Sequence, residues 1–134
     1  ALIVIGLTAK QIEQLPNTMI KIARTSSVKE LAEYYSLADV TVVPSYEDNY
    51  PTVVLESLAC GTPVVAYATG GIPEMEQPPT LTTVEKGDLD ALGACLRTRT
   101  EIGSWNVDVS RFDKTVSAKA MVDIYRDVLL KKGD

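Results

Sequence analysis

Two carboxylates lie on either side of a predicted helix start and could together bind a phosphate that carries hydroxyl groups. Asp48 belongs to a polar loop, and Glu56 follows eight positions later in an apolar helix predicted over Thr52–Cys60. The free N–H groups at such a start favour a phosphate, and here they belong to Thr52 and Val53. Carboxylates accept hydrogen bonds from hydroxyls. This arrangement suits a ligand in which hydroxyls flank a phosphate, such as a sugar nucleotide.

Glu56 also has a simpler interpretation, in which it lies at the solvent edge of its helix and interacts only with the helix dipole. Burying a carboxylate is costly unless a partner satisfies it. The apolar helix around Glu56 therefore predicts either an exposed side chain or a bound partner, and the sequence leaves both interpretations open.

Residue content excludes several common catalytic arrangements. The chain has no histidine, which removes Ser-His-Asp and Cys-His nucleophiles, histidine-ligated metals and imidazole acids or bases. Its two cysteines, Cys60 and Cys95, cannot build a disulfide framework or a four-ligand zinc site. Neither the dinucleotide-binding fingerprint nor the P-loop follows a predicted strand. We therefore expect no metal site and no resident cofactor.

Composition predicts one globular domain that does not bind nucleic acid. The chain has 134 residues, of which 46% are hydrophobic and 23% are charged, and its formal net charge is −5. A protein that binds a nucleic-acid backbone would be expected to carry a basic surplus. No apolar run approaches the about 18 residues of a membrane span. The chain starts at Ala1 and enters an apolar run at once, so we expect it to be a fragment of a longer protein.

Short apolar runs alternate with helical patterns, which predicts βαβ units and a parallel sheet. We expect strands over Leu2–Ile5, Met19–Ala23, Val40–Val43, Pro63–Tyr67 and Leu81–Val84. We expect five helices: residues 8–15, a helix that starts at the capping box Ser27–Glu30, Thr52–Cys60, Asp88 to about Arg97, and Asp113–Lys131. We also expect a break at residues 77–79 and an irregular stretch over residues 100–112. Right-handed crossovers make this a doubly wound α/β fold, with ligands outside the carboxyl ends of the strands.

An ordered set of short motifs runs through residues 38–74. In chain order, the set comprises Ala38-Asp39-Val40, Pro44-Ser45, residues 47–51, residues 55–66 and Gly70-Gly71-Ile72-Pro73-Glu74. This set resembles the C-terminal half of a family 4 glycosyltransferase, and the flanking residues fit the same family more loosely. The resemblance implies an α/β, doubly wound parallel sheet that forms the Rossmann-like half of a GT-B fold.

The resemblance implies a catalytic-site role for each of the two carboxylates. Glu56 would bind the ribose hydroxyls of the donor nucleotide. Asp48, or Glu47 just before it, would contact the hydroxyls of the transferred sugar. Family members often carry Gly-Phe-Gly after the first acid, where this chain has Asn49-Tyr50-Pro51. Asn49 and Tyr50 would therefore belong to the substrate-binding loop.

The resemblance also implies where the phosphate and the base would bind. Pro51 has no N–H to donate, so the phosphate contact would rest on the N–H groups of Thr52 and Val53. The base would lie near Gly6 and near Arg24 and Thr25, mostly on backbone groups.

The resemblance implies that residues 1–134 belong to a longer enzyme, in which they would form a partial C-terminal nucleotide-sugar-binding domain. The first strand-helix unit of that domain and an N-terminal acceptor domain would lie upstream of Leu2. The whole enzyme would move a hexosyl-type group from a nucleotide diphosphate sugar to the hydroxyl of a glycan or lipid-linked acceptor, with retention at the anomeric carbon. We expect it in the cytoplasm, where it could be peripheral to the inner face of the membrane.

Two other functions fit a doubly wound domain. A non-catalytic interaction or signalling module is one, but a signalling receiver would need an acidic pair after its first strand, where this chain has Gly6-Leu7-Thr8. A sugar-nucleotide epimerase shares the GT-B layout, but its usual reliance on histidine is not met here.

Overall fold

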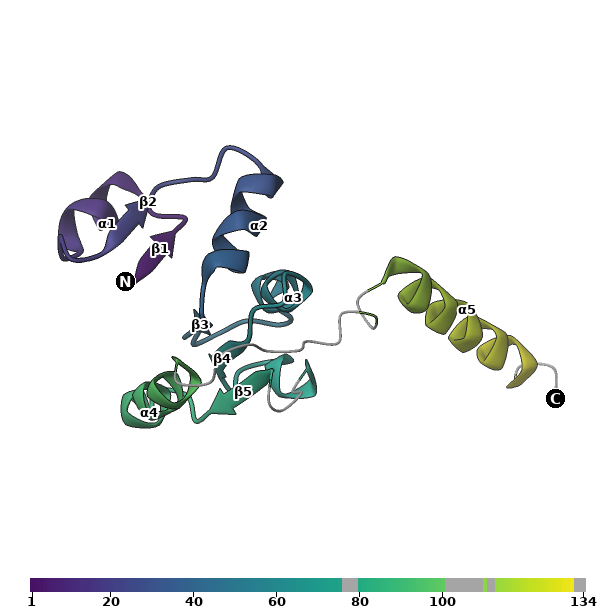
Figure 1. Ribbon diagram of the computed structural model, residues 1–134. Coiled ribbons are helices and arrows are strands. Elements are labelled where there is room, and N and C mark those ends of the chain that lie inside the picture. The colour runs from purple at the N-terminus through teal and green to yellow at the C-terminus, as the bar shows by residue number, and fades with distance from the viewer. Residues whose placement is uncertain (76–79, 101–109, 111–112, 132–134) are drawn as a thin grey trace.

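The computed structural model of the chain describes residues 1–75, 80–100, 110 and 113–131, which alternate between strands and helices as predicted (Figure 1). The predicted break at 77–79 and most of the irregular stretch over 100–112 lie outside the described residues. In order, the elements are β1 (Ile3–Ile5), α1 (Ala9–Gln14), β2 (Ile20–Ile22), α2 (Val28–Leu37), β3 (Thr41–Val43), α3 (Thr52–Ala59), β4 (Val64–Tyr67), the 3-10 helix η1 (Ile72–Met75), β5 (Leu81–Val84), α4 (Leu89–Thr100) and α5 (Lys114–Lys131).

The described strands all pair in parallel, but they form two separate sheets. β1 pairs with β2, and Val4 lies opposite Lys21. β4 lies between β3 and β5, so that Val65 faces Val42 on one side and Thr82 on the other. The α/β parallel class is therefore confirmed. The single doubly wound sheet that the sequence predicts is divided, because no described strand joins β1 to β3.

The core is built on both faces of β4, whose four residues are all buried. On one face, Val64 and Ala66 pack with side chains of α3 and η1, including Leu58 and Ile72. On the other face, Val65 and Tyr67 pack with Leu92 of α4 and its half-buried neighbours. Helices thus cover both faces of the three-stranded sheet, as a parallel sheet requires.

Ser57 fixes α3 against the sheet through hydrogen bonds. Its buried hydroxyl bonds to the Thr41 hydroxyl at 2.8 Å and donates to the Thr62 carbonyl at 3.0 Å. A buried hydroxyl needs such partners, and these two come from β3 and from the turn that leads into β4. α3, whose first turn carries part of the predicted site, is therefore anchored to both strands through its second half.

The helix starts follow local sequence signals, with one correction. Thr8 caps α1, and it forms a reciprocal capping box with Gln11. Ser27 caps α2 by accepting a hydrogen bond from the Glu30 N–H at 3.1 Å. The predicted second half of that capping box is wrong, since the Glu30 carboxylate accepts from the N–H and hydroxyl of Ser26, one residue earlier. These bonds lower the pKa of Glu30.

The last helix, α5, extends away from the other elements (Figure 1). Its residues 114–130 are all exposed, including large apolar side chains such as Met121, Ile124 and Leu129. Within the described residues, neither α5 nor any other helix combines the length and the apolar content needed to cross a membrane.

Candidate active site

The loop over residues 45–51, here called the acid loop, connects the carboxyl end of β3 to the start of α3. Asp48 is half-buried, whereas Glu47, Asn49 and Tyr50 are exposed. Ligands of parallel α/β sheets bind outside the carboxyl ends of the strands. The acid loop therefore places these four predicted residues at the edge of the sheet where a ligand is expected.

A second loop supports the acid loop from the carboxyl end of the neighbouring strand β4. The Gly71 N–H donates to the Asn49 carbonyl at 2.7 Å, and the Thr69 hydroxyl donates to the Ser45 carbonyl at 3.0 Å. We call Thr69, Gly70 and Gly71 the glycine turn. The acid loop is thus bonded to the glycine turn at its first residue and at Asn49.

The glycines of this turn are required by the closeness of the acid loop. A Cβ atom at Gly70 would lie 1.6 Å from the Asp48 carbonyl oxygen, and one at Gly71 would lie 2.6 Å from the Asn49 carbonyl oxygen. Gly70 also has a φ of 55°, which a side chain disfavours. The turn therefore sets the position of the Asp48 backbone.

The start of α3 offers backbone donors that no side chain caps. Pro51 is the N-cap residue, and its side chain makes no capping hydrogen bond. Thr52 and Val53 follow it and are exposed. The first N–H groups of a helix lack partners within the helix and lie at its positive end. This start of α3 can accept an anion at the same sheet edge as the acid loop.

Glu56 is exposed on the second turn of α3, on the side opposite Val54, Ser57 and Leu58, which are buried. Its carboxylate accepts a hydrogen bond of 3.0 Å from the hydroxyl of Tyr35 on α2. Partial burial raises the pKa of Tyr35, and the Glu56 carboxylate raises it further.

Tyr35 is a partner that the sequence did not identify, because it lies 21 residues before Glu56. The backbone carbonyl of Tyr35 accepts a 2.5 Å hydrogen bond from the Thr62 hydroxyl, which ties α2 to the turn before β4. Glu56 thus has the solvent-exposed position of the simpler interpretation together with a specific hydrogen-bond partner. The Tyr35 hydroxyl occupies one part of the carboxylate, which can accept about four hydrogen bonds in total.

The predicted base-binding residues form a separate group at the two-stranded sheet. Gly6 follows β1 with a φ of 88°, and its N–H donates to the Ile22 carbonyl at 3.0 Å. Arg24, which is exposed, and Thr25, which is half-buried, follow the neighbouring strand β2. Among the described residues no hydrogen bond or ion pair joins this group to the acid loop. The structure therefore gathers the predicted site in two parts, each at the carboxyl end of its own sheet.

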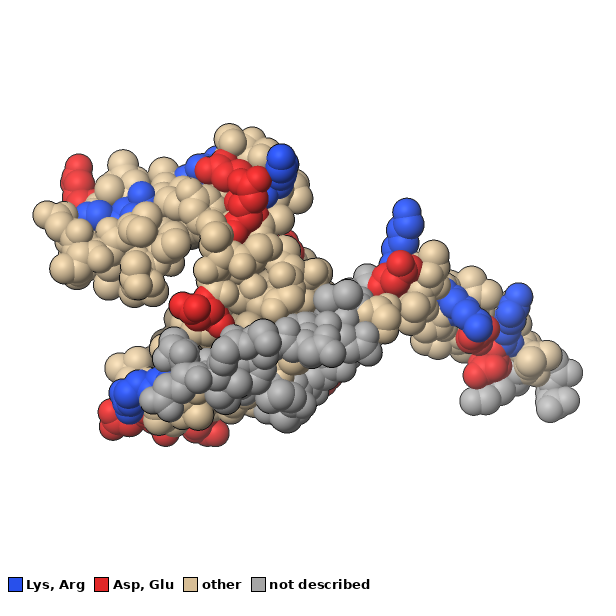
Figure 2. Space-filling view, viewed as in Figure 1, with Lys and Arg blue, Asp and Glu red and all other residues tan. Residues whose placement is uncertain are grey.

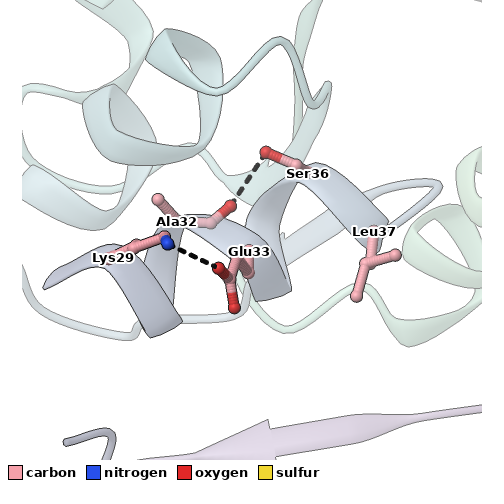
Figure 3. Close-up of a pocket in the computed structure, with 5 residues that line it drawn as sticks. All are labelled: Lys29, Ala32, Glu33, Ser36 and Leu37. Atoms are coloured by element: carbon pink, nitrogen blue, oxygen red, sulfur yellow. Dashed lines mark hydrogen bonds and ion pairs between the residues drawn. The ribbon is translucent and has the colours of Figure 1, made fainter. Parts of the chain in front are cut away.

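A hollow of about 450 Å³ lies elsewhere, along one side of α2 (Figure 3). It is lined by Lys29, Ala32, Glu33, Ser36 and Leu37, none of which belongs to the predicted site. The part of the chain that the structure describes contains no group of three or more cysteine, aspartate or glutamate side chains placed to hold a metal ion.

Sequence comparisons with known proteins relate this chain to glycosyltransferases. Residues 1–99 match the model of the family described as glycosyl transferases group 1. The chain is 48% identical over 54 residues to D-inositol 3-phosphate glycosyltransferase from Streptosporangium roseum. The aligned residues cover 40% of this chain and 12% of that protein. It is 45% identical over 73 residues to the enzyme of the same name from Geodermatophilus obscurus. That match covers 50% of this chain and 16% of that protein.

A solved structure agrees with the sequence comparisons. Sucrose-phosphate synthase from Thermosynechococcus elongatus superposes with a TM-score of 0.65 and 28% sequence identity, over 90% of this chain and 33% of that one. The chain thus spans only a small part of the proteins that it resembles. Because the family match covers most of the chain, and the parallel α/β architecture agrees with it, this chain belongs to the glycosyl transferases group 1 family.

Proposed function

We propose that this chain binds the nucleotide diphosphate sugar donor of a retaining glycosyltransferase. The observation that carries the proposal is the arrangement at the carboxyl end of β3, where the acid loop leads into an uncapped helix start and Glu56 follows one turn later. Such a helix start favours phosphate, and the carboxylates on either side of it are suited to sugar hydroxyls.

Each group would have one task in donor binding. The N–H groups of Thr52 and Val53 would bind a phosphate of the donor. Glu56 has capacity left beside its bond from Tyr35, and it would accept hydrogen bonds from the ribose hydroxyls. Asp48, which is half-buried and held by the glycine turn, would bind the transferred sugar.

Three further residues complete the proposed donor site. Glu47 is the alternative to Asp48 for the sugar contact, since it lies one residue earlier in the acid loop and is exposed. Asn49 and Tyr50 would line the donor from the same loop. The base would lie at Gly6 and beside Arg24 and Thr25, where the C=O groups and N–H groups at the ends of β1 and β2 can recognise it.

The reaction that we propose for the whole protein moves a hexosyl-type group to an acceptor hydroxyl in glycan or polysaccharide synthesis, with retention at the anomeric carbon. The leaving diphosphate would be stabilised by the helix start of α3 and by cations supplied outside this chain, without a metal or resident cofactor. The acceptor, a glycan or a lipid-linked molecule, would bind to a second domain. We propose a cytoplasmic location, peripheral to the inner membrane face if the acceptor is lipid-linked.

The names of the relatives suggest which class of acceptor to assay first. Two of them are named as D-inositol 3-phosphate glycosyltransferases, and the superposed structure is a sucrose-phosphate synthase. Those names each include a phosphorylated polyol or sugar. We therefore propose phosphorylated polyols as the first acceptors to test with the protein encoded by the complete gene. A non-catalytic module is not favoured, since the matched family consists of transferases.

The test of donor binding is a titration of the chain with a nucleoside diphosphate, followed by chemical shifts. We expect roughly millimolar affinity, about −4 kcal/mol, because in this proposal the cations for the diphosphate would be supplied from outside this chain. Glu56→Ala should weaken binding strongly, since hydrogen bonds to a charged group are worth about 1.5–3 kcal/mol. Asp48→Ala should change it little, because the plain diphosphate carries no sugar.

Glu13→Ala, which removes an exposed carboxylate from α1, is the matched control for the change in net charge. Equal losses in Glu56→Ala and Asp48→Ala would show that the roles of the two carboxylates are assigned wrongly. Binding that is unchanged in Glu56→Ala would leave Glu56 as an exposed carboxylate without a ligand.

A further inference from the structure

α2 packs beside α3, and a side-chain hydrogen bond joins the two helices (Figure 1). The Tyr35 hydroxyl donates to the Oε2 atom of Glu56 at 3.0 Å. Glu56 is exposed, so without this bond its long side chain would be free to sample many rotamers. The Oε1 atom of Glu56 has no hydrogen-bond partner among the described residues. The bond from Tyr35 therefore holds one carboxylate oxygen in place and leaves the other open to a ligand.

Tyr35 is itself fixed by bonds that do not involve its hydroxyl. Its backbone carbonyl accepts hydrogen bonds from the Thr62 hydroxyl at 2.5 Å and from the Ala38 N–H at 3.1 Å. The Thr62 N–H in turn donates at 3.0 Å to the carbonyl of Ser57, the residue after Glu56. The backbones of the two helices are thus linked independently of the side-chain bond. Removing only the Tyr35 hydroxyl should leave both helices in place and release the Glu56 carboxylate.

Within the described part of the chain, no cation competes with Tyr35 for Glu56. The sequence has no lysine or arginine between Lys29 and Lys86, and among the described residues Glu56 makes no ion pair. In the space-filling view, no basic side chain lies on the visible surface over α3 (Figure 2). Partial burial and the bond to Glu56 raise the pKa of Tyr35, so its hydroxyl stays protonated at neutral pH. Glu56 thus keeps its negative charge for a ligand while a neutral hydroxyl holds it.

We propose that Tyr35 is a positioning residue, which holds the Glu56 carboxylate in the orientation that accepts the two ribose hydroxyls of a nucleoside diphosphate. This inference rests on the donor-binding role proposed for Glu56, and it adds a residue of α2, outside the acid loop and α3. Ordering a mobile side chain during binding lowers affinity, and the bond from Tyr35 orders Glu56 before the ligand arrives. Tyr35 thereby raises the selectivity of the site for ribose over a sugar without these hydroxyls.

The test compares a nucleoside diphosphate with its 2′,3′-dideoxy counterpart, for uridine, adenosine and guanosine in turn, by calorimetric titration of the protein encoded by the complete gene. The dideoxy nucleotide lacks both ribose hydroxyls, so its affinity reports every contact except the one with Glu56. We expect wild-type protein to bind the ribonucleotide at least about tenfold more tightly, since its hydroxyls bond to a charged group. Tyr35→Phe should lower this ratio of affinities about twofold to tenfold, which corresponds to ordering one side chain.

Two further variants separate positioning from a structural effect. Tyr34→Phe removes the hydroxyl of the neighbouring half-buried tyrosine and is the matched control, which should leave the ratio of affinities unchanged. If Tyr35 acts through Glu56, then adding Tyr35→Phe to Glu56→Ala should not change the ratio further. A structural role of Tyr35 would instead weaken the binding of both nucleotides alike and leave their ratio at the wild-type value.

Three results would overturn the inference. If Glu56→Ala lowers the ratio of affinities and Tyr35→Phe does not, Glu56 binds ribose without help from Tyr35, and the proposed donor binding stands. Tighter binding of the ribonucleotide by Tyr35→Phe would show that the Tyr35 hydroxyl competes with ribose for the carboxylate. Equal wild-type affinities within each of the three nucleotide pairs would contradict both this inference and the donor-binding role of Glu56.

Discussion

Replacing Gly70 by alanine should be more destabilising than the same change at other glycines with positive φ. The Cβ atom would lie 1.6 Å from the Asp48 carbonyl oxygen, so the backbone of the acid loop has to move by more than an ångström. Gly70 also has a φ of 55°. The substitution therefore combines backbone strain with a collision that involves main-chain atoms, which cannot rotate away.

Two other glycines separate these effects. Gly61 has a φ of 82°, and a Cβ atom added there would have no neighbour within 4 Å, so Gly61→Ala introduces strain alone. Gly71 has no positive φ, but its Cβ atom would lie 2.6 Å from the Asn49 carbonyl oxygen, so Gly71→Ala introduces the collision alone. Strain of this kind costs about 1–2 kcal/mol, and overpacking costs about 1–3 kcal/mol.

The expected loss in the free energy of unfolding is therefore about 2–5 kcal/mol for Gly70→Ala, which is the strain and the overpacking together. Urea unfolding followed by circular dichroism measures it, and unchanged m-values would show that the transitions are comparable. A loss in Gly70→Ala no larger than that in Gly61→Ala would refute the packing of the acid loop on the glycine turn.

Three further predictions concern activity and pH. The 134-residue chain should release no nucleoside diphosphate from any sugar nucleotide, because catalysis needs both reactants held together; robust turnover would contradict this. Because the pKa of Tyr35 is raised in the folded state, the contribution of Tyr35 to stability should be present below pH about 10 and lost as the pH rises further. The free energy of unfolding should therefore fall less steeply with rising alkaline pH in Tyr35→Phe than in Tyr34→Phe. Because the pKa of Glu30 is lowered by Ser26, its contribution should be present above its ordinary pKa of 4.5 and lost on acidification. Glu30→Gln should show a weaker loss of stability in acid.

Much of the fold was predictable from the sequence because its signals are local. β1 and β4 are short apolar runs and the other strands are partly apolar, and several are bounded by residues that end a strand, such as Gly6 and Pro44. The helices over α1, α2 and α3 follow from caps and apolar spacing, with boundaries that differ by one or two residues. Parallel pairing followed from the alternation itself.

The division into two sheets was not predictable in this way. Whether β1 pairs with β3 depends on contacts between residues far apart in the chain, and neither apolar run states which neighbour it will have. The same limit applies to the capping box at α2, where Glu30 could reach either Ser26 or Ser27, and the structure places it on Ser26.

The candidate site was predictable only as a set of residues. The acid loop and the start of α3 follow directly from the residue order, and the roles of Asp48 and Glu56 stay predictions. The bond from Tyr35 to Glu56 and the packing of Gly70 on Asp48 join residues 21 or 22 positions apart, in separate elements. Neither contact has a signal in local spacing, since each depends on how two elements pack.

The most direct test of donor binding is the amide chemical shift of Thr52 and Val53 during titration with a nucleoside diphosphate. If the start of α3 binds the phosphate, these two amides should show the largest chemical-shift changes in the chain. Both chemical shifts should return to their ligand-free values when the ligand is removed. Saturating shifts confined to other residues, such as Lys29 at the hollow on α2, with Thr52 and Val53 unchanged, would contradict the proposed site.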